Sequence, residues 1–495
     1  MTAAALLVAS LSAVAAASPP RFKVEALAVE GEVAQVAAAD FDGDGKKDLL
    51  AVYTTGLPPY QKRFFAVFWN RNGLFAPRPD LVMPVSDEEA CAFDVGRTSG
   101  IAEDLLVLTP HGILAQSFPN RVAQPKRVLL EHPTLFHQPI EGQLPRMQVV
   151  QDLFAPGSHD ILLPALGSLA VYRRGPLAYD KIAELDIDMD VSGVARRNPG
   201  RSEVSPFEVR YGFPALHLGD TTGRKLLDII ATQEDRVAVY RQEPGPTFHE
   251  QPDFTRDFSV RTAADHRERE SSASVLVADL DGDGVADLVV RKQVLQGISS
   301  ATATLYVFFG HKGGGYDAKP AQLLETQGIG LLQPQLIDLT GDGRPDLVVP
   351  ETSFGVFALI RMLAAKTAKV NFQVFPFERE KRRFAEDPAF ERSLVFRIPV
   401  AGGADLQAIS LDADVTGDRR PDLVFGSSED ELSIFPATRA GEFANEAVEV
   451  IPVLATAQLE AVDLENKGRA DLILHYPQTL GHRREIVVLV NLGGW

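Results

Sequence analysis

The sequence of 495 residues predicts an all-β fold, a closed β-propeller of four-stranded blades. Three observations predict it. A nine-residue acidic motif recurs along the chain, each copy precedes an apolar run, and successive copies start about 49 to 76 residues apart. Such a period, with several short strands per unit, is typical of propeller blades rather than of a helical solenoid.

The motif has the form D-x-[DT]-G-D-G-x-x-D in its best copies, which start at Asp40, Asp279, Asp338 and Asp414. The runs that follow are LLAVY, LVV, LVV and LVF, and their composition indicates buried strands. Glycines at positions four and six allow positive φ, so the loop can curl tightly. The fourth copy departs from the pattern because Arg419 occupies position six.

Carboxylates at positions one, three, five and nine can then converge on one point. Crowded carboxylates repel one another unless a cation lies between them, and a flexible set of oxygen donors favours calcium over zinc or magnesium. We expect the main-chain carbonyl of position seven to complete each site. The expected ligands are Asp40, Asp42, Asp44, Lys46 and Asp48; Asp279, Asp281, Asp283, Val285 and Asp287; Asp338, Thr340, Asp342, Arg344 and Asp346; and Asp414, Thr416, Asp418, Arg420 and Asp422.

Two other interpretations of the motif fit less well. An EF-hand loop has twelve residues, ends in glutamate and lies between helices, whereas these loops close at the ninth residue and lead into strands. A solvated Asp-Gly turn would explain one such loop. It does not explain four copies with the same internal spacing.

Weaker copies keep only the eight-residue spacing between the first and last aspartates. They run from Asp152 to Asp160, from Asp220 to Asp228 and from Asp463 to Asp471, and a looser copy runs from Asp94 to Asp104. Arg224 and Lys467 occupy position five in two of them. We expect these side chains to replace the metal by pairing with the remaining carboxylates.

Eight units predict eight blades, or seven if the Asp94 copy is not a true unit. The last unit ends in REIVVLVNLGGW, which would be its third strand, and RFKVEALAVE adds one strand before the first acidic loop. We therefore expect the N-terminal strand to complete the last blade and close the ring, which hides unpaired strand edges.

These motifs resemble the FG-GAP and VCBS repeat family, which includes the propeller of integrin α subunits and many secreted bacterial proteins. The D-x-[DT]-G-D-G-x-x-D-L-V core carries the resemblance, which extends from about Arg21 to Trp495. It implies a propeller with calcium between the first and second strands of some blades. Family members serve as adhesins, ligand binders and scaffolds, and occasionally as parts of lyases, so the resemblance implies no single activity.

The first residues predict the location of the protein. Residues 1–17 form an apolar stretch that ends in Ala15-Ala16-Ala17 before Ser18, typical of a signal peptide, although its start lacks Lys or Arg. We expect residues 18–495 to form one exported domain without a membrane span.

The formal net charge of −18 argues against nucleic acid as a partner. Cys91, the single cysteine, can form no internal disulfide.

Three long polar connections are candidate binding loops on the face opposite the calcium loops. They span residues 190–212, 257–272 and 376–393. Long loops on a rigid scaffold often carry recognition, although solvated loops would look the same. The basic residues that we expect to bind an anionic glycan or an acidic protein surface include Arg196, Arg197, Arg201, Arg382 and Arg383.

A search for catalytic motifs finds no H-E-x-x-H, no G-x-S-x-G and no phosphate-binding loop. The ten histidines are scattered. Metal-bound carboxylates are poor acid–base groups. The sequence therefore favours a non-catalytic, calcium-binding scaffold for binding or adhesion. The alternative is a calcium-dependent polysaccharide lyase, or another carbohydrate-active enzyme, on an eight-bladed propeller.

Overall fold

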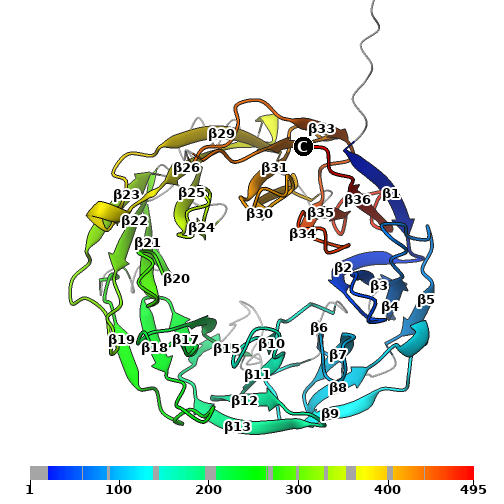
Figure 1. The fold of residues 1–495 in the computed structure, drawn as a ribbon, viewed down its shortest axis with the longest axis horizontal. Coiled ribbons are helices and arrows are strands. Elements are labelled where there is room, and N and C mark those ends of the chain that lie inside the picture. Colours follow the sequence, from blue (N-terminus) through cyan, green and yellow to red (C-terminus); the bar gives the residue numbers. More distant parts are fainter. Residues whose placement is uncertain are drawn as a thin grey trace, which may run out of the picture.

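The computed structural model describes residues 21–495 except 58–59, 86–89, 138–143, 195–207, 263–264, 266–270, 297–299, 328–332, 353–363, 398–404 and 440. The expected signal peptide and the basic residues Arg196, Arg197 and Arg201 lie outside the described residues. Within them, eight four-stranded antiparallel sheets form a ring (Figure 1). The fold is an eight-bladed β-propeller, which confirms the predicted fold class and decides between eight and seven blades.

The first strand of each blade lines the channel and the fourth lies outside. Blade 1 comprises β2 (Glu32–Ala39), β3 (Asp48–Thr55), β4 (Lys62–Phe68) and β5 (Leu81–Pro84), and blade 2 comprises β6 (Ala92–Gly96), β7 (Asp104–Thr109), β8 (Gly112–Gln116) and β9 (Arg127–Glu131). Blade 3 comprises β10 (Val150–Gln151), β11 (Asp160–Ala165), β12 (Ser168–Arg174) and β13 (Tyr179–Asp186), and blade 4 comprises β16 (Ala215–Gly219), β17 (Asp228–Gln233), β18 (Arg236–Tyr240) and β19 (Phe254–Asp257).

Blades 5 to 8 follow the same order. Blade 5 comprises β20 (Ser271–Ala278), β21 (Asp287–Gln296), β22 (Ser300–Phe308) and β23 (Gln322–Gln327), and blade 6 comprises β24 (Gln335–Ile337), β25 (Asp346–Thr352), β26 (Thr367–Phe375) and β29 (Phe390–Arg397). Blade 7 comprises β30 (Ile409–Ala413), β31 (Asp422–Gly426), β32 (Glu431–Phe435) and β33 (Glu449–Pro452), and blade 8 comprises β34 (Gln458–Val462), β35 (Asp471–His475), β36 (Glu485–Asn491) and β1 (Phe22–Ala28).

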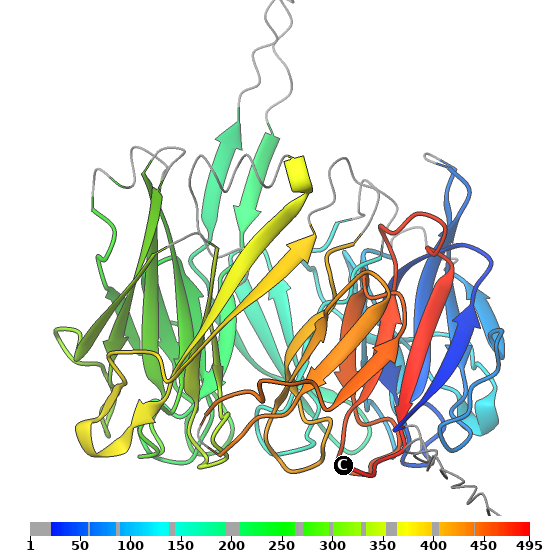
Figure 2. The same ribbon diagram turned by 90° about the horizontal axis from the view of Figure 1, so that it is seen from above.

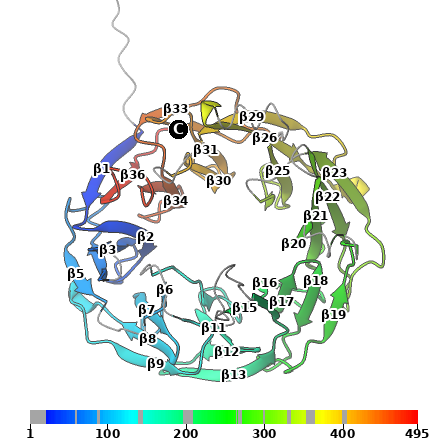
Figure 3. The same cartoon turned by 180° about the vertical axis from the view of Figure 1, so that it is seen from behind.

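The last blade combines both ends of the chain. Strand β1 pairs antiparallel with β36 in a register that runs from Phe22 opposite Asn491 to Ala28 opposite Glu485. The first described strand is therefore the fourth strand of blade 8, beside the C-terminus (Figure 3). This confirms the predicted ring closure.

The apolar runs after the acidic loops are buried on both sides because each blade is packed between two others. In β3, Leu50 and Val52 belong to a hydrophobic cluster shared with blade 2. The alternate residues Leu49 and Ala51 belong to a cluster shared with blade 8. Successive side chains of a strand point to opposite faces, so a strand between two blades must be apolar throughout. Each buried leucine stabilises the ring by about 2 kcal/mol.

The two faces of the ring carry different connections. The loops that join the first and second strands lie on the face of the C-terminus, which we call the loop face (Figure 2). The hairpin of β14 (Asp190–Val194) and β15 (Glu208–Gly212) extends from the opposite face between blades 3 and 4, as expected for an inter-blade connection.

The expectation for the third long connection is wrong. Residues 376–389 join β26 to β29, the third and fourth strands of blade 6, and do not join two blades. This segment contains the short pair of β27 (Phe377–Glu378) and β28 (Arg383–Phe384) and the 3-10 turn η2 (Arg379–Lys381). It lies on the loop face, as does the shorter η1 (Pro119–Arg121) in the same place of blade 2.

The segment before blade 3 runs along the first strand of blade 2. Residues 145–147 run beside β6, where the Phe93 amide donates to the Pro145 carbonyl over 3.0 Å and the Met147 amide donates to the Phe93 carbonyl over 2.9 Å. This places the Arg146 guanidinium 3.8 Å from Glu460 of blade 8. In the part of the chain that the structure describes, no helix is long and apolar enough to cross a membrane.

Candidate metal centre

We number each acidic loop by its blade, so the intact copies that start at Asp40, Asp279, Asp338 and Asp414 are loops 1, 5, 6 and 7. The first aspartate of each intact loop organises the loop backbone. In loop 1, Asp40 accepts hydrogen bonds from the amides of Gly43 at 2.8 Å, Asp44 at 3.1 Å and Gly45 at 3.0 Å. Gly43 and Gly45 have φ of 77° and 86°, which only glycine adopts at little cost. Asp279, Asp338 and Asp414 accept the equivalent three bonds in their loops.

The ninth aspartate joins the loop to the third strand of its blade. In loop 1, Asp48 accepts from the Phe41 amide at 3.1 Å and from the Asn70 amide, after β4, at 2.9 Å. In loop 5, Asp287 accepts from Leu280 at 2.9 Å and from Gly310 at 2.8 Å. The same pair of bonds is made by Asp160, Asp228, Asp346, Asp422 and Asp471.

Burial has a large effect on these ninth aspartates. Desolvation is the largest cause of a rise in the pKa of both Asp48 and Asp287 to about 7, and the charges of nearby loop carboxylates contribute to the same rise. Their hydrogen bonds to backbone amides oppose this rise. Because the bonds occur in intact and degenerate loops alike, position nine has a structural role that does not depend on a metal.

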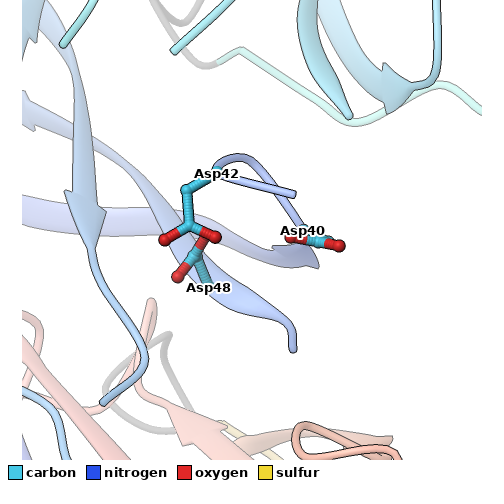
Figure 4. A group of neighbouring side chains, drawn as sticks. All are labelled: Asp40, Asp42 and Asp48. Atoms are coloured by element: carbon cyan, nitrogen blue, oxygen red, sulfur yellow. The ribbon is translucent and has the colours of Figure 1, made fainter. Parts of the chain in front are cut away.

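The oxygen atoms of two loops lie close enough together for one cation. Asp40, Asp42 and Asp48 in loop 1 each offer an oxygen within 4.8 Å of the others (Figure 4), as do Asp279, Asp281 and Asp283 in loop 5. A site whose donor atoms are all oxygen suits calcium.

Loops 6 and 7 carry threonine at position three, as Thr340 and Thr416. Among the described residues the buried hydroxyl of Thr416 has no hydrogen-bond partner. A ligand oxygen at this position would fit that observation. The coordination by the carbonyls of Lys46, Val285, Arg344 and Arg420 stays a prediction.

Two arginines that the sequence analysis did not assign to the loops contact the third position. The Nε of Arg121 donates to Asp42 over 2.7 Å, and the Nε of Arg382 donates to Asp281 over the same distance. Both come from the connection between the third and fourth strands of the following blade, and both have positive φ, 63° and 49°. Each guanidinium lies over an aromatic ring, Trp69 at 5.7 Å and Phe309 at 4.5 Å.

Main-chain hydrogen bonds link some of the neighbouring loops. Loops 6 and 7 have proline at position eight and lack the donor, but in three other loops the amide at position eight donates to the carbonyl at position one of the preceding blade's loop. This bond is 2.7 Å long from Glu103 to Asp40, from Ala286 to Asp220 and from Ala470 to Asp414. In these pairs, a change in the shape of one loop would alter a hydrogen bond of the next loop.

The basic residues of the degenerate loops pair within their own blades. Lys467 forms an ion pair with Glu465, and its amide donates to Asp463 over 2.8 Å. Arg224 lies 3.8 Å from Asp228 and donates to the Thr222 hydroxyl over 2.8 Å.

The looser copy at Asp94 has a different basis, since Asp94 lies within β6. It accepts from the amides of Val149 and Val150 at 2.9 and 3.1 Å. Gly96 stands eight residues before Asp104, so blade 2 lacks the first loop aspartate.

Comparison with known proteins identifies the repeat. Residues 220–290 match the FG-GAP-like repeat family. A structure of an Agrocybe aegerita lectin that recognises non-reducing terminal N-acetylglucosamine aligns with 94% of this chain and 87% of its own, at 15% identity and a TM-score of 0.37. The Dos1 propeller aligns with 94% of this chain and 80% of its own, at 8% identity and a TM-score of 0.31.

No curated protein matches the sequence. The family match and the ring of eight blades agree with the motifs that run through the whole chain. Together they support the conclusion that this protein is a repeat propeller of the FG-GAP/VCBS type.

Proposed function

We propose that this propeller is an exported, calcium-stabilised and non-catalytic scaffold that binds another molecule. The fold itself supports an interaction scaffold at a general level. The observation that carries the calcium part is the convergence of three carboxylates in loop 1 and three in loop 5. When bound, calcium would supply positive charge to groups that otherwise repel one another.

The charge balance of loop 1 supports this proposal. Asp42 and Asp44 both raise the pKa of the buried Asp48, which means that the ionised loop is electrostatically unfavourable without a cation. Arg121 neutralises only part of that charge through Asp42. A divalent cation held by Asp40, Asp42 and Asp48 would remove the repulsion and fix the loop against blade 2.

The surroundings of two of the described histidines, His475 and His217, do not favour acid–base catalysis. Burial lowers the pKa of His475 to about 4. Burial also lowers the pKa of His217, which contacts the Thr232 hydroxyl at 3.1 Å. Residues kept away from solvent in this way are poorly placed to exchange protons with a substrate.

Two of the expected ligand-binding arginines are engaged within the protein. Arg382 pairs with Asp281, and Arg383 lies 2.7 Å from Glu386. Both lie on the loop face rather than on the opposite face. A ligand that used them would have to compete with these internal carboxylates, so arginines without such partners are better candidates.

Calcium titration of the protein after chelation tests the proposal. Thermal unfolding should shift to higher temperature with calcium, because a ligand that binds only the folded state stabilises it by mass action. Calorimetry should detect binding that Asp281→Asn weakens, and equimolar magnesium should substitute poorly. An unfolding temperature that is the same in calcium and in chelator would refute the calcium part.

Two further measurements test the other parts of the proposal. Expression of the full chain followed by N-terminal sequencing of the exported product should show cleavage after Ala17. Incubation with acidic polysaccharides should produce no unsaturated products absorbing in the ultraviolet. Calcium-dependent production of such products would instead identify the protein as a lyase.

A further inference from the structure

We propose that the cleft between blades 6 and 7 on the loop face binds a carboxylated saccharide through Arg419 and Arg439. The inference rests on the proposed function as a binding scaffold, and it names the site and the chemistry of the ligand. The cleft has a volume of about 610 Å³ and is lined by both acidic loops and by the connection between β32 and β33. Thr340, Pro376 and Phe377 complete its wall.

The first observation is that Arg439 lacks the partner that its counterparts have. In blades 2 and 6, the connection between the third and fourth strands supplies Arg121 and Arg382, which pair with aspartate at position three of the preceding loop. Blade 7 supplies Arg439 from the same connection, and the preceding loop carries the uncharged Thr340. The exposed Arg439 guanidinium makes no ion pair or hydrogen bond with the described residues.

The second observation concerns Arg419, which occupies position six of loop 7 with φ of 66°. Loops 1, 5 and 6 have glycine there, whereas loop 4 has Lys225 with φ of 61°. The Arg419 amide donates to Asp414 over 2.8 Å, as glycine does in the other loops. The arginine therefore adds nothing to the loop backbone, while its exposed guanidinium lines the cleft and has no partner among the described residues.

The acidic residues of the cleft do not cancel these two charges. Asp342 is paired with Arg344 at 3.1 Å, and Asp418 is paired with Arg420. Asp346 is buried and accepts from the amides of Leu339 and Phe377 at 3.1 and 3.2 Å. The cleft thus presents two uncompensated guanidiniums, groups whose planar donors match a carboxylate.

The volume favours a saccharide over an acidic side chain of a protein. A cleft of about 610 Å³ falls within the range of small-molecule sites, whereas a single Asp or Glu side chain would fill little of it. The lining also offers hydroxyl and main-chain groups beside the arginines, at Thr340 and Gly341. A short sugar chain with one carboxylate and several hydroxyls uses both kinds of group.

Binding of a glucuronate-containing tetrasaccharide to the whole protein in calcium tests the inference. The same tetrasaccharide with its carboxylates reduced to alcohols should bind at least tenfold more weakly. Arg439→Ser and Arg419→Gly should each weaken binding about tenfold. Arg419→Gly should leave the unfolding temperature unchanged or higher, because glycine suits the positive φ.

Arg236→Ser is the matched control, because Arg236 is an exposed arginine of blade 4 that pairs with Asp188 at 2.7 Å, away from the cleft. It should keep full affinity. Equal binding of the reduced saccharide, or preferential binding of a poly-glutamate peptide, would overturn the saccharide assignment. If neither the saccharides nor the peptide bind while calcium still stabilises the protein, this inference alone is overturned. If the saccharide binds but calcium does not stabilise the protein, the assignment of the cleft stands and the calcium part of the proposed function is overturned.

Discussion

Loops 5 and 8 have the same backbone design and different charges. In both, the first aspartate accepts loop amides, and the ninth aspartate ties the loop to the end of the third strand. Loop 5 then places Asp283 at position five, where loop 8 has Lys467 paired with Glu465. The comparison teaches that positions one and nine make the loop shape. We expect positions three and five to decide whether the loop accepts a metal ion or a basic side chain.

The largest expected effect comes from position nine. Asp287→Ala and Asp471→Ala each leave two buried amides without an acceptor, which should lower the free energy of unfolding by about 3 kcal/mol. The loss should be similar in both blades when denaturation is measured in chelator. Asp412→Ala, at an exposed site in β30, is the control and should have little effect. Full rescue of Asp287→Ala by calcium would mean that position nine acts mainly through the metal.

The second prediction concerns the residue four positions after the ninth aspartate. Blade 5 has Arg291 there, which donates to Gln333 over 3.1 Å, and blade 8 has the buried His475. The unfolded chain takes up a proton near pH 6.5, but the buried ring does so only near pH 4. Between these values the unfolded state binds more protons, so stability falls as the pH is lowered through this window.

At pH 5 this uptake should lower the free energy of unfolding by about 2 kcal/mol relative to pH 7.5. His475→Leu should remove that part of the pH dependence, which urea denaturation at the two pH values would measure. Identical pH profiles for the variant and the unaltered protein would show that His475 does not titrate as its burial implies.

The third prediction converts one loop of the comparison into the other. Lys467→Asp gives loop 8 an acidic residue at position five beside Asp463, Glu465 and Asp471. Calorimetry should then detect one additional calcium per chain, with a stabilisation of about 1–2 kcal/mol at saturating calcium. Lys467→Gln removes the charge without adding a ligand, and it should add no site. Calcium bound by loop 8 in the unaltered protein would refute the view that the lysine replaces the metal.

The smallest expected effect comes from the arginine over loop 5. Arg382→Gln removes an ion pair to Asp281 and a stacking contact with Phe309, both partly exposed to solvent. The free energy of unfolding in chelator should fall by about 0.5–1 kcal/mol. Arg383→Gln tests the neighbouring half-buried arginine, which pairs with Glu386, and should lower the free energy of unfolding less. Thermal unfolding of the two variants side by side would measure the difference.

The sequence predicts most of the fold because its signals are local. The first and ninth aspartates lie on one hairpin loop, and the apolar run begins at the ninth, so each blade can be recognised without knowledge of the others. Asp94 was misleading because Gly96 occupies the first position in that blade, and the aspartate two residues earlier serves a different contact. Residues 376–389 were assigned to the wrong face because a long hairpin within a blade looks like an inter-blade connection.

The candidate site is only partly visible in the sequence. The aspartates of the site can be recognised in the sequence. Arg121 and Arg382 cannot, because they lie 79 and 101 positions from the carboxylates that they contact. Nothing in the local sequence distinguishes them from the other surface arginines. Their equivalence appears only when the blades are placed side by side, since each follows the third strand of the blade after an intact loop.

The pairing of β1 with β36 has a consequence for the order of events during synthesis. Phe22 and Asn491 face each other across the last blade, although nearly the whole chain separates them. Blades 1 to 7 can form as the chain leaves the ribosome, but blade 8 must wait for the final residues. Until then β1 presents an open edge to other nascent copies. Exchange of β1 between two unfinished molecules is the misassembly to which this architecture is most exposed.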